Sequence, residues 1–421
     1  MAPPFRPLER VGRGSGGRAK DLRSLALPPK YSATGRRPEC SASMRILVLN
    51  YEFPPIGGGG GRFTADLCRH LARFGHDLRV LTSRYHGLPA VEVHEGYEIY
   101  RTWSGRSQAH TCTVPEMAVY LAANLVPALR HATSWRPQVV NVHFAVPTGV
   151  LAWIVRRSTG IPYVLSAQLG DIPGGVPVQT EHLFRWVKPF TVPIWREAAA
   201  ATVPSGEVAE LVRRAYGLSA HVIPNGVELE ALNPMVPEVH SPVRLVFVGR
   251  FSPQKNLPFL LEVLGKLRDL DWRLDLVGDG PLRGELEDLA LRSDLASKVH
   301  FHGWVTPEAA TAVLRTSDLL VMPSLSEGLP LVGLQALGLG LALAVSDHPS
   351  FHDLVQNGVN GFTGPATDAK AFARRLRDLL ANPPVLLAMK RASLDMAPRF
   401  EAGRIARQME TLLLAAAESA S

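Results

Sequence analysis

The sequence predicts an α/β fold with two Rossmann-like, doubly wound domains facing each other across a cleft. Short apolar runs alternate with helical patterns along residues 44–395, which is typical of parallel sheets. A Pro-rich stretch at residues 225–240 divides these runs into two series. The 421 residues, 46% hydrophobic and 20% charged, suffice for two cores in a globular protein.

Residues 1–43 are rich in Arg, Pro, Gly and Ser, without apolar periodicity, and are predicted to be a disordered basic tail. They hold nine of the 45 Lys and Arg and three of the 38 Asp and Glu, which is +6 of the net charge of +7. The composition therefore predicts no nucleic-acid partner. The tail is either a targeting or regulatory segment or, the favoured interpretation, an upstream extension before a working start at Met44.

Residues 44–224 are predicted to be the first, acceptor-side domain. Its expected strands are 45–50, 78–82, 138–142 and 162–166. One helix is expected between the first two strands, at 62–74. Loops 84–115 and 171–190 are expected to carry acceptor specificity. Segment 183–203 mixes aromatic and basic residues, so peripheral membrane contact is an open alternative, but Pro189 and Pro193 argue against one continuous helix.

Residues 225–240 are predicted to be a linker and residues 241–395 the second domain. Its expected strands are 243–249, 272–277, 298–302, 318–322 and 341–345. Residues 396–421 are expected to form a final helix that packs back on the first domain.

Ligands of open parallel sheets gather at the carboxyl ends of the strands. Arg250 and Lys255 follow the first strand of the second domain, where two cations would stabilise the charge on a diphosphate leaving group. Glu327 follows a later strand, and with Gly328 it is expected to open a helix. Its carboxylate could accept hydrogen bonds from sugar hydroxyls. The alternative for Arg250 and Lys255 is a solvated loop without a ligand, and the alternative for Glu327 is a helix cap.

Further candidates lie close to these positions. The main-chain N–H groups of Gly328, Leu329 and Leu331 are expected to face a phosphate. Gln335 would lie two turns along the helix. The turn of Gly278, Asp279 and Gly280 either admits a base or ribose or is a plain turn. His300 and His302 lack a third ligand nearby, so packing is favoured over a metal site.

The first domain offers a glycine run after its first strand. Gly58, Gly59, Gly60 and Gly61 would let a ligand approach the backbone and cradle an anion. The run lacks the GxGxxG spacing, which argues against dinucleotide binding. Gln168 and Asp171 end the fourth strand, and Asp171 is either an acceptor-side residue or a helix cap.

These motifs together resemble a retaining glycosyltransferase of family 4 with the GT-B architecture (glycosyl transferases group 1). The resemblance covers nearly all of residues 44–395. The matching pieces, in order, are the glycine run, Gly75-His76-Asp77, Pro224-Asn-Gly-Val227, Val248-Gly-Arg250 with Lys255-Asn-Leu257, Val277-Gly-Asp-Gly-Pro281, Glu327-Gly-Leu-Pro330 and Asn360-Gly361.

The resemblance implies that Arg250 and Lys255 bind the donor diphosphate, Glu327 the donor sugar, and the turns near Gly278 and Trp304 the nucleobase. It implies a nucleotide-sugar donor and no metal or other cofactor. Two departures are Gln335, where the family usually has a second Glu on the ribose, and Gln168, where it often has a His.

The leading prediction is thus a hexosyltransferase acting with retention on an unknown acceptor, which is lipid-linked, a polysaccharide or a small molecule. A catalytically silent relative that binds a nucleotide sugar is the main alternative, and a GT-B epimerase or phosphorylase a lesser one. The three scattered cysteines suit a reducing compartment, so we expect a cytoplasmic protein, with the inner membrane face as the alternative.

Overall fold

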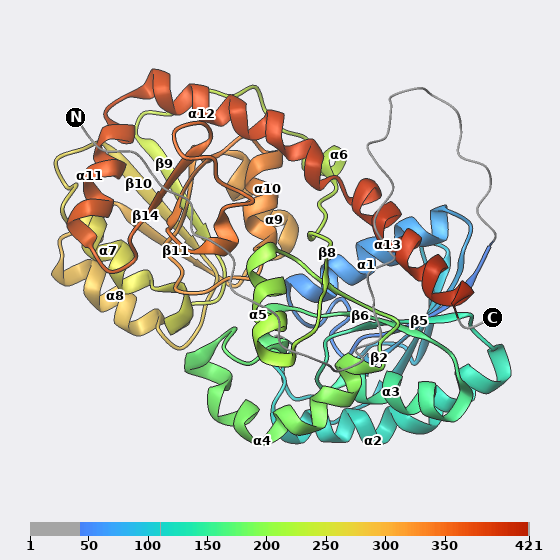
Figure 1. Ribbon diagram of the computed structural model, residues 1–421. Coiled ribbons are helices and arrows are strands. Elements are labelled where there is room, and N and C mark those ends of the chain that lie inside the picture. The colour runs from blue at the N-terminus through green and yellow to red at the C-terminus, as the bar shows by residue number, and fades with distance from the viewer. Residues whose placement is uncertain (1–42, 110, 420–421) are drawn as a thin grey trace, which may run out of the picture. The chain divides into compact units, whose positions relative to one another are not determined.

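Two mainly parallel β-sheets with flanking helices make up the described chain (Figure 1). This computed structural model describes residues 43–109 and 111–419, without the side chains of 177–183, 185 and 186. All but the last residue of the predicted tail 1–43 lies outside the described residues. Residues Ser43–Ser421 cluster as one unit.

The first sheet has eight strands in the order β3-β4-β2-β1-β5-β6-β7-β8. Only β3 runs antiparallel to its neighbour. The strands are β1 (Arg45–Leu49), β2 (Asp77–Arg84), β3 (Val91–His94), β4 (Tyr97–Trp103), β5 (Val139–His143), β6 (Tyr163–Ser166), β7 (Ala200–Val203) and β8 (His221–Val222). Its helices are α1 (Gly59–Arg73), α2 (Val114–Arg130), η1 (His131–Trp135), α3 (Thr148–Thr159), η2 (Leu169–Asp171), α4 (Pro177–Arg196) and α5 (Gly206–Tyr216).

The second sheet has six parallel strands in the order β11-β10-β9-β12-β13-β14. They are β9 (Val243–Val248), β10 (Trp272–Val277), β11 (Val299–Gly303), β12 (Leu319–Met322), β13 (Ala342–Ser346) and β14 (Gly361–Gly364). The helices of this half are α6 (Leu229–Leu232), η3 (Pro253–Lys255), α7 (Leu257–Gly265), α8 (Arg283–Arg292), α9 (Pro307–Arg315), α10 (Leu331–Gly338), η4 (Pro349–Phe351), α11 (Ala369–Leu380), α12 (Pro383–Met396), η5 (Ala397–Phe400) and α13 (Ala402–Glu418).

The central strands form because both of their faces are buried. On β9, Leu245 and Phe247 belong to one apolar cluster, and Val246 between them belongs to the cluster on the opposite face. Such strands appear in the sequence as continuous apolar runs. The α/β class with two Rossmann-like domains is confirmed.

Three expectations about the first half are wrong. The expected loop 84–115 contains β3 and β4, which extend the sheet, and most of the expected loop 171–190 belongs to helix α4. The expected break at Pro189 and Pro193 is absent, because α4 runs through both prolines. Each proline removes one helical hydrogen bond. Burial of Ile194 and Trp195 in the core beside α3 offsets that loss.

Three helices begin elsewhere than expected. The final helix, α13, starts at Ala402, after the short helix η5, and not at residue 396. Helix α1 starts at Gly59, so three glycines lie inside its first turn. Helix α10 starts at Leu331 and not at Glu327, with Pro330 in an extended conformation as its N-cap. A residue that precedes proline is disfavoured in the helical region, which keeps Leu329 out of the helix.

The chain crosses between the halves twice. Val227, in the expected linker 225–240, accepts a hydrogen bond from Ala402 N (3.0 Å), and Val227 N donates to Phe400 O (2.9 Å). Helix α13 then returns to the first sheet, where Ile405 and Met409 share an apolar cluster with Ile46 of β1.

Candidate active site

The second sheet brings two strand-end turns together. Strand β9 pairs directly with β12, so the turns that follow them are neighbours. Gln254, in the turn after β9, accepts a hydrogen bond from Leu325 N (2.8 Å), and its side-chain amide donates to Ser326 O (2.7 Å). These bonds hold Lys255 and Glu327, the next residue on each turn, side by side.

Lys255 and Glu327 form a direct ion pair. Lys255 Nζ donates to Glu327 Oε1 at 2.6 Å. Glu327 is buried, Lys255 is half-buried, and Ser350 Oγ donates to the main-chain oxygen of Glu327. Arg250, on the same turn as Lys255, is exposed. The structure therefore brings the predicted cations and carboxylate to one edge of the sheet.

His348 lies near this carboxylate and was missed by the sequence reasoning. Burial lowers the pKa of His348, and the carboxylates of Glu207 and Glu327 oppose that shift. Its Nδ1 accepts a hydrogen bond from Ser350 N (3.3 Å). His348 and Ser350 follow β13 directly, so the rule that polar residues after buried strands line a site would have found them.

Of the main-chain donors expected to meet a phosphate, those of Gly328 and Leu329 lie before helix α10, and that of Leu331 belongs to its first residue. Gly328 packs against Leu169 of the first half, because a Cβ added to it would lie 3.4 Å from Leu169 Cβ. Leu329 O accepts from Asn225 Nδ2 (2.9 Å). Leu331 opens α10, and Gln335 is half-buried midway along it.

The Gly278 turn owes its glycine to the neighbouring backbone. Gly278 has φ +134°, and a Cβ there would lie 2.0 Å from Gly249 O, in the turn after β9. Asp279 accepts from Gly280 N (2.7 Å) and pairs with Arg283 (3.1 Å).

Trp304 follows the strand next to this turn. Gly278 N donates to Gly303 O at 2.9 Å, and Trp304 is half exposed. The turn and Trp304 are thus neighbours.

The glycine run of the first half lies against both halves of the chain. A Cβ added to Gly61 would lie 2.3 Å from Glu52 O, and one on Gly60 would lie 2.7 Å from Phe144 Cζ. One on Gly59 would lie 3.7 Å from Leu331 Cβ, whereas one on Gly58 would meet nothing within 4 Å. Gly58 is therefore the position of the run where the backbone is open to an approaching ligand.

Asp171 occupies a cap. Its carboxylate accepts hydrogen bonds from Gln168 N (2.8 Å) and Val146 N (3.3 Å). Burial raises the pKa of Asp171 to about 7, and the hydrogen bonds from the backbone partly offset that rise. Gln168 is half-buried at the end of β6. The hydrogen bonds of the Asp171 side chain are those of a cap.

His143 is a second buried titratable group at this edge. It is the last residue of β5, and burial lowers its pKa to about 3. Its Nε2 has no hydrogen-bond partner within the described residues. The imidazole is therefore neutral across the physiological pH range.

Within residues 43–109 and 111–419, no group of three or more His, Cys, Asp and Glu side chains is arranged to hold a metal ion. His302, which the sequence assigned to packing, bonds Asp275 (2.8 Å). None of the helices in the described ranges is both long and apolar enough to span a membrane.

Two family profiles match the chain. "Glycosyltransferase Family 4" matches residues 57–231, and "Glycosyl transferases group 1" matches residues 235–395. A glycogen synthase from Mycobacterium tuberculosis is 26% identical over 386 residues, covering 83% of this chain and 89% of that protein.

Solved structures show the same fold. Sucrose-phosphate synthase from Thermosynechococcus elongatus has a TM-score of 0.77 at 19% identity, covering 88% of this chain and 98% of the other. Anabaena HepE, in complex with UDP-glucose, has a TM-score of 0.69 at 18% identity, covering 88% and 100%. The chain is therefore a GT-B glycosyltransferase whose two halves match, in order, the family 4 and group 1 domains.

Proposed function

We propose that this protein transfers a hexosyl group from a nucleoside-diphosphate sugar to an acceptor with retention of the anomeric configuration. The observation that carries the proposal is the contact between Lys255 Nζ and Glu327 Oε1 (2.6 Å) at the carboxyl-terminal edge of the second sheet. Three parts of this statement are proposed: the retention of configuration, the hexosyl nature of the transferred group and the existence of an acceptor.

The charges of the site suit a diphosphate leaving group. Lys255 has three N–H donors, of which Glu327 uses one, and Arg250 lies on the same turn. Both cations stabilise the charge that grows on the diphosphate as the glycosidic bond breaks. When a phosphate oxygen replaces Glu327 as the partner of Lys255 Nζ, the Glu327 carboxylate becomes able to accept hydrogen bonds from the hydroxyls of the donor sugar.

The nucleoside is assigned to the turn of Gly278, Asp279 and Gly280 and to Trp304, because these turns are neighbours at the same edge. Gln335 would hydrogen-bond the ribose without a charge. HepE, with the same fold, was solved in complex with UDP-glucose, which makes that donor the first to test. The proposed reaction uses no metal or other cofactor.

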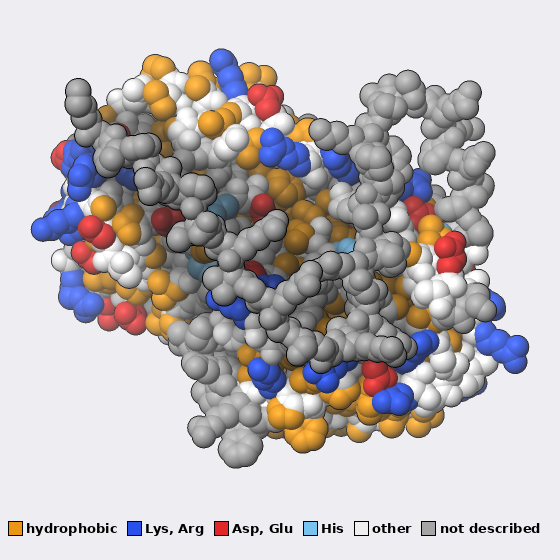
Figure 2. All heavy atoms as spheres, viewed as in Figure 1, with side chains coloured by type: hydrophobic (Ala, Val, Ile, Leu, Met, Phe, Trp, Pro, Cys, Tyr) orange, Lys and Arg blue, Asp and Glu red, His pale blue; other side chains and the backbone are white. Residues whose placement is uncertain are grey.

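The acceptor is assigned to the first sheet, near Gly58, Gly59, Gly60 and Gly61 and near Gln168 and Asp171. Lipid-linked, polysaccharide and small-molecule acceptors all fit the proposal. Figure 2 shows hydrophobic and basic side chains interspersed along the lower edge of the view, where Figure 1 places α2 and α4. Phe190 on α4 is 78% exposed, which supports peripheral contact with a membrane.

Purified protein tested with UDP-glucose, ADP-glucose and GDP-mannose decides the matter. We expect hydrolysis or transfer of one donor, and NMR of the product should show the anomeric configuration of the donor. The variant Lys255→Ala should lower this activity. Its matched control is Lys266→Ala, which removes an exposed ion pair with Glu262 in the same half. Donor binding without turnover on any acceptor would instead identify a silent relative, the alternative that Gln335 and Gln168 favour.

A further inference from the structure

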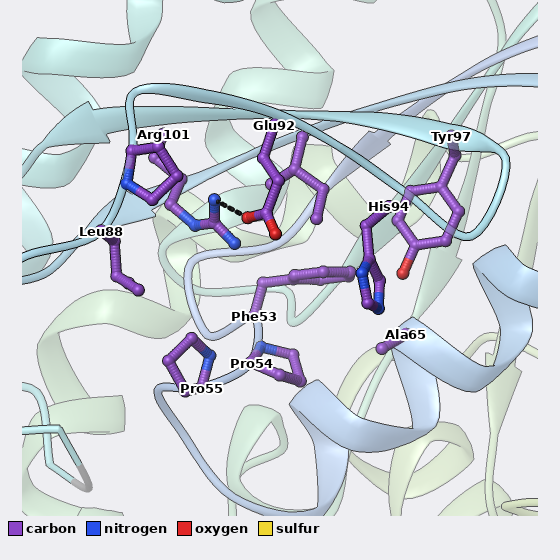
Figure 3. Close-up of a pocket in the computed structure, with 11 residues that line it drawn as sticks. Phe53, Pro54, Pro55, Ala65, Leu88, Glu92, His94, Tyr97 and Arg101 are labelled. Atoms are coloured by element: carbon purple, nitrogen blue, oxygen red, sulfur yellow. Dashed lines mark hydrogen bonds and ion pairs between the residues drawn. The ribbon is translucent and has the colours of Figure 1, made fainter.

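A cavity of about 320 Å³ opens on the first half, and neither Lys255 nor Glu327 is among its lining residues (Figure 3). Pro54 and Pro55, from the loop after β1, form one wall, and Leu88 and Pro89, after β2, form another. Phe53 lies between these walls and the β3–β4 hairpin in the view. The volume is at the lower end of the range for small-molecule sites.

The cavity is largely apolar, and its charges are balanced. Arg101 donates from one guanidinium nitrogen to Glu92 Oε2 at 2.6 Å, and the Arg101 side chain is 3% exposed. An anion would have to displace Glu92 from this buried cation, which costs free energy. The lining therefore suits a neutral, apolar group.

Two buried polar groups of the lining, Arg101 Nε and the Tyr97 hydroxyl, have no hydrogen-bond partner within the described residues. The Tyr97 hydroxyl belongs to a residue that is 2% exposed. Figure 3 shows it directed toward His94 and Ala65. Tyr97 and Arg101 lie four residues apart on β4, so they mark two ends of the cavity about 13 Å apart. An unpaired buried hydroxyl is costly, and a ligand oxygen would satisfy it.

The size of the cavity sets the size of the occupant. An apolar cavity of about 150 Å³ takes up benzene, so about twice that volume has room for two fused rings or a short acyl chain. Pro54 and Pro55 come a few residues before the glycine run in the same loop, so the cavity borders the loop assigned to the acceptor.

We propose that this cavity binds the apolar aglycone of the acceptor, a neutral two-ring or short-chain group with one oxygen that accepts a hydrogen bond from Tyr97. This proposal rests on the proposed function, because only a transferase has an acceptor. The binding site itself can be tested without any turnover.

The binding test uses 2-naphthol and isothermal titration calorimetry. We expect wild-type protein to bind it with a dissociation constant of about 1 mM or lower. Ala65→Phe, which fills the cavity from α1, should abolish binding, and Tyr97→Phe should weaken it about fivefold. Ala122→Phe, at an exposed position of α2, is the matched control and should bind as the wild type does. Absent binding, or binding that survives Ala65→Phe, would overturn the proposal.

The acceptor test compares methyl, octyl and 2-naphthyl β-D-glucosides with the active donor. We expect the octyl and naphthyl glucosides to have at least tenfold higher kcat/KM than the methyl glucoside, through KM. Ala65→Phe should remove this preference, whereas Ala122→Phe should keep it. Equal rates on all three glucosides, or 2-naphthol acting noncompetitively against the naphthyl glucoside, would overturn the aglycone assignment. A failure of the proposed function differs from these results, because no donor would then be hydrolysed while 2-naphthol still bound.

Discussion

The carboxyl-terminal edges of the two sheets handle charge in opposite ways. At the second edge, charged side chains meet each other: Lys255 contacts Glu327 at 2.6 Å, and Asp279 contacts Arg283 at 3.1 Å. At the first edge, His143 and Asp171 are buried without an opposite charge in contact, and burial moves both pKa values toward the neutral form. The first edge therefore differs from the second in these two desolvated groups and not in a lack of ion pairs, since Arg106 contacts Glu52 there at 3.3 Å.

Desolvation explains this difference. A buried charge is costly unless a partner compensates it, so cations beside a carboxylate can stay ionised. Where no opposite charge is in contact, as at His143 and Asp171, the cost is lowered by keeping the titratable group uncharged. Variants that remove a charge from one edge or expose one at the other test this comparison.

The largest expected effect is on catalysis at the charged edge. Lys255→Ala should lower kcat/KM by about 10²–10³-fold, since it removes a fixed cation from the developing negative charge and leaves Glu327 buried and unpaired. Steady-state kinetics with the active donor measures it, with Lys266→Ala as the control. Activity within twofold of the wild type would show that this edge does not bind the leaving group.

The next effect is on the pH dependence of stability at the neutral edge. Between pH 4.5 and 6.5 the native state holds the Asp171 proton that the unfolded state has lost, so this group makes stability fall as pH rises. The native state lacks the His143 proton that the unfolded state binds, so that group makes stability rise. The two contributions cancel in this window.

Asp171→Asn should therefore make the free energy of unfolding rise with pH, relative to the wild type, by up to about 2.7 kcal/mol over these two pH units. His143→Phe should make it fall by a similar amount. Urea unfolding at pH 4.5, 5.5 and 6.5 measures both slopes. Parallel curves for wild type and variants would mean that neither group is shifted by burial.

A smaller effect separates two glycines of the same run. Gly61→Ala should lower the free energy of unfolding by about 1–3 kcal/mol, because its Cβ would meet Glu52 O at 2.3 Å. Gly58→Ala, where the space is open, should change it by less than about 0.5 kcal/mol and act instead on acceptor KM. Thermal unfolding of both variants gives the comparison, and equal losses would contradict it.

The smallest effect is at Gln335. Gln335→Glu should keep or tighten donor binding, by up to about fivefold, since a carboxylate accepts a stronger hydrogen bond from a ribose hydroxyl than an amide does. Calorimetric titration with UDP measures it. A large loss of affinity would assign this half-buried position a different role.

The sequence predicted best where a strand is buried on both faces, as in β9 and β12, because a continuous apolar run admits few other interpretations. It also placed Arg250, Lys255 and Glu327 at strand ends. The adjacency of β9 and β12, which makes Lys255 and Glu327 touch, depends on the strand order. No local pattern encodes that order.

The errors have local causes. Strand β4 alternates buried and half-buried residues from Tyr97 to Thr102, but the sequence does not show this alternation, because one of the buried residues is Arg101. Pro189 and Pro193 predict a break in α4 by a local rule, but the tertiary packing of Ile194 and Trp195 overrides that rule. Pro330 carried a usable signal, since it excludes Leu329 from a helix.

Helix α13 has a consequence for synthesis of the protein. It supplies Ile405, Met409 and Leu413 to the cluster that holds β1, and Glu410 to a 2.9 Å bond with buried His76. A ribosome makes β1 about 350 residues before this helix. Until then α1 supplies the helical part of this cluster, through Phe63, Leu67 and Leu71, so the core of the first sheet closes only after the second half has been translated. Apolar surface of the first sheet therefore stays exposed during much of synthesis.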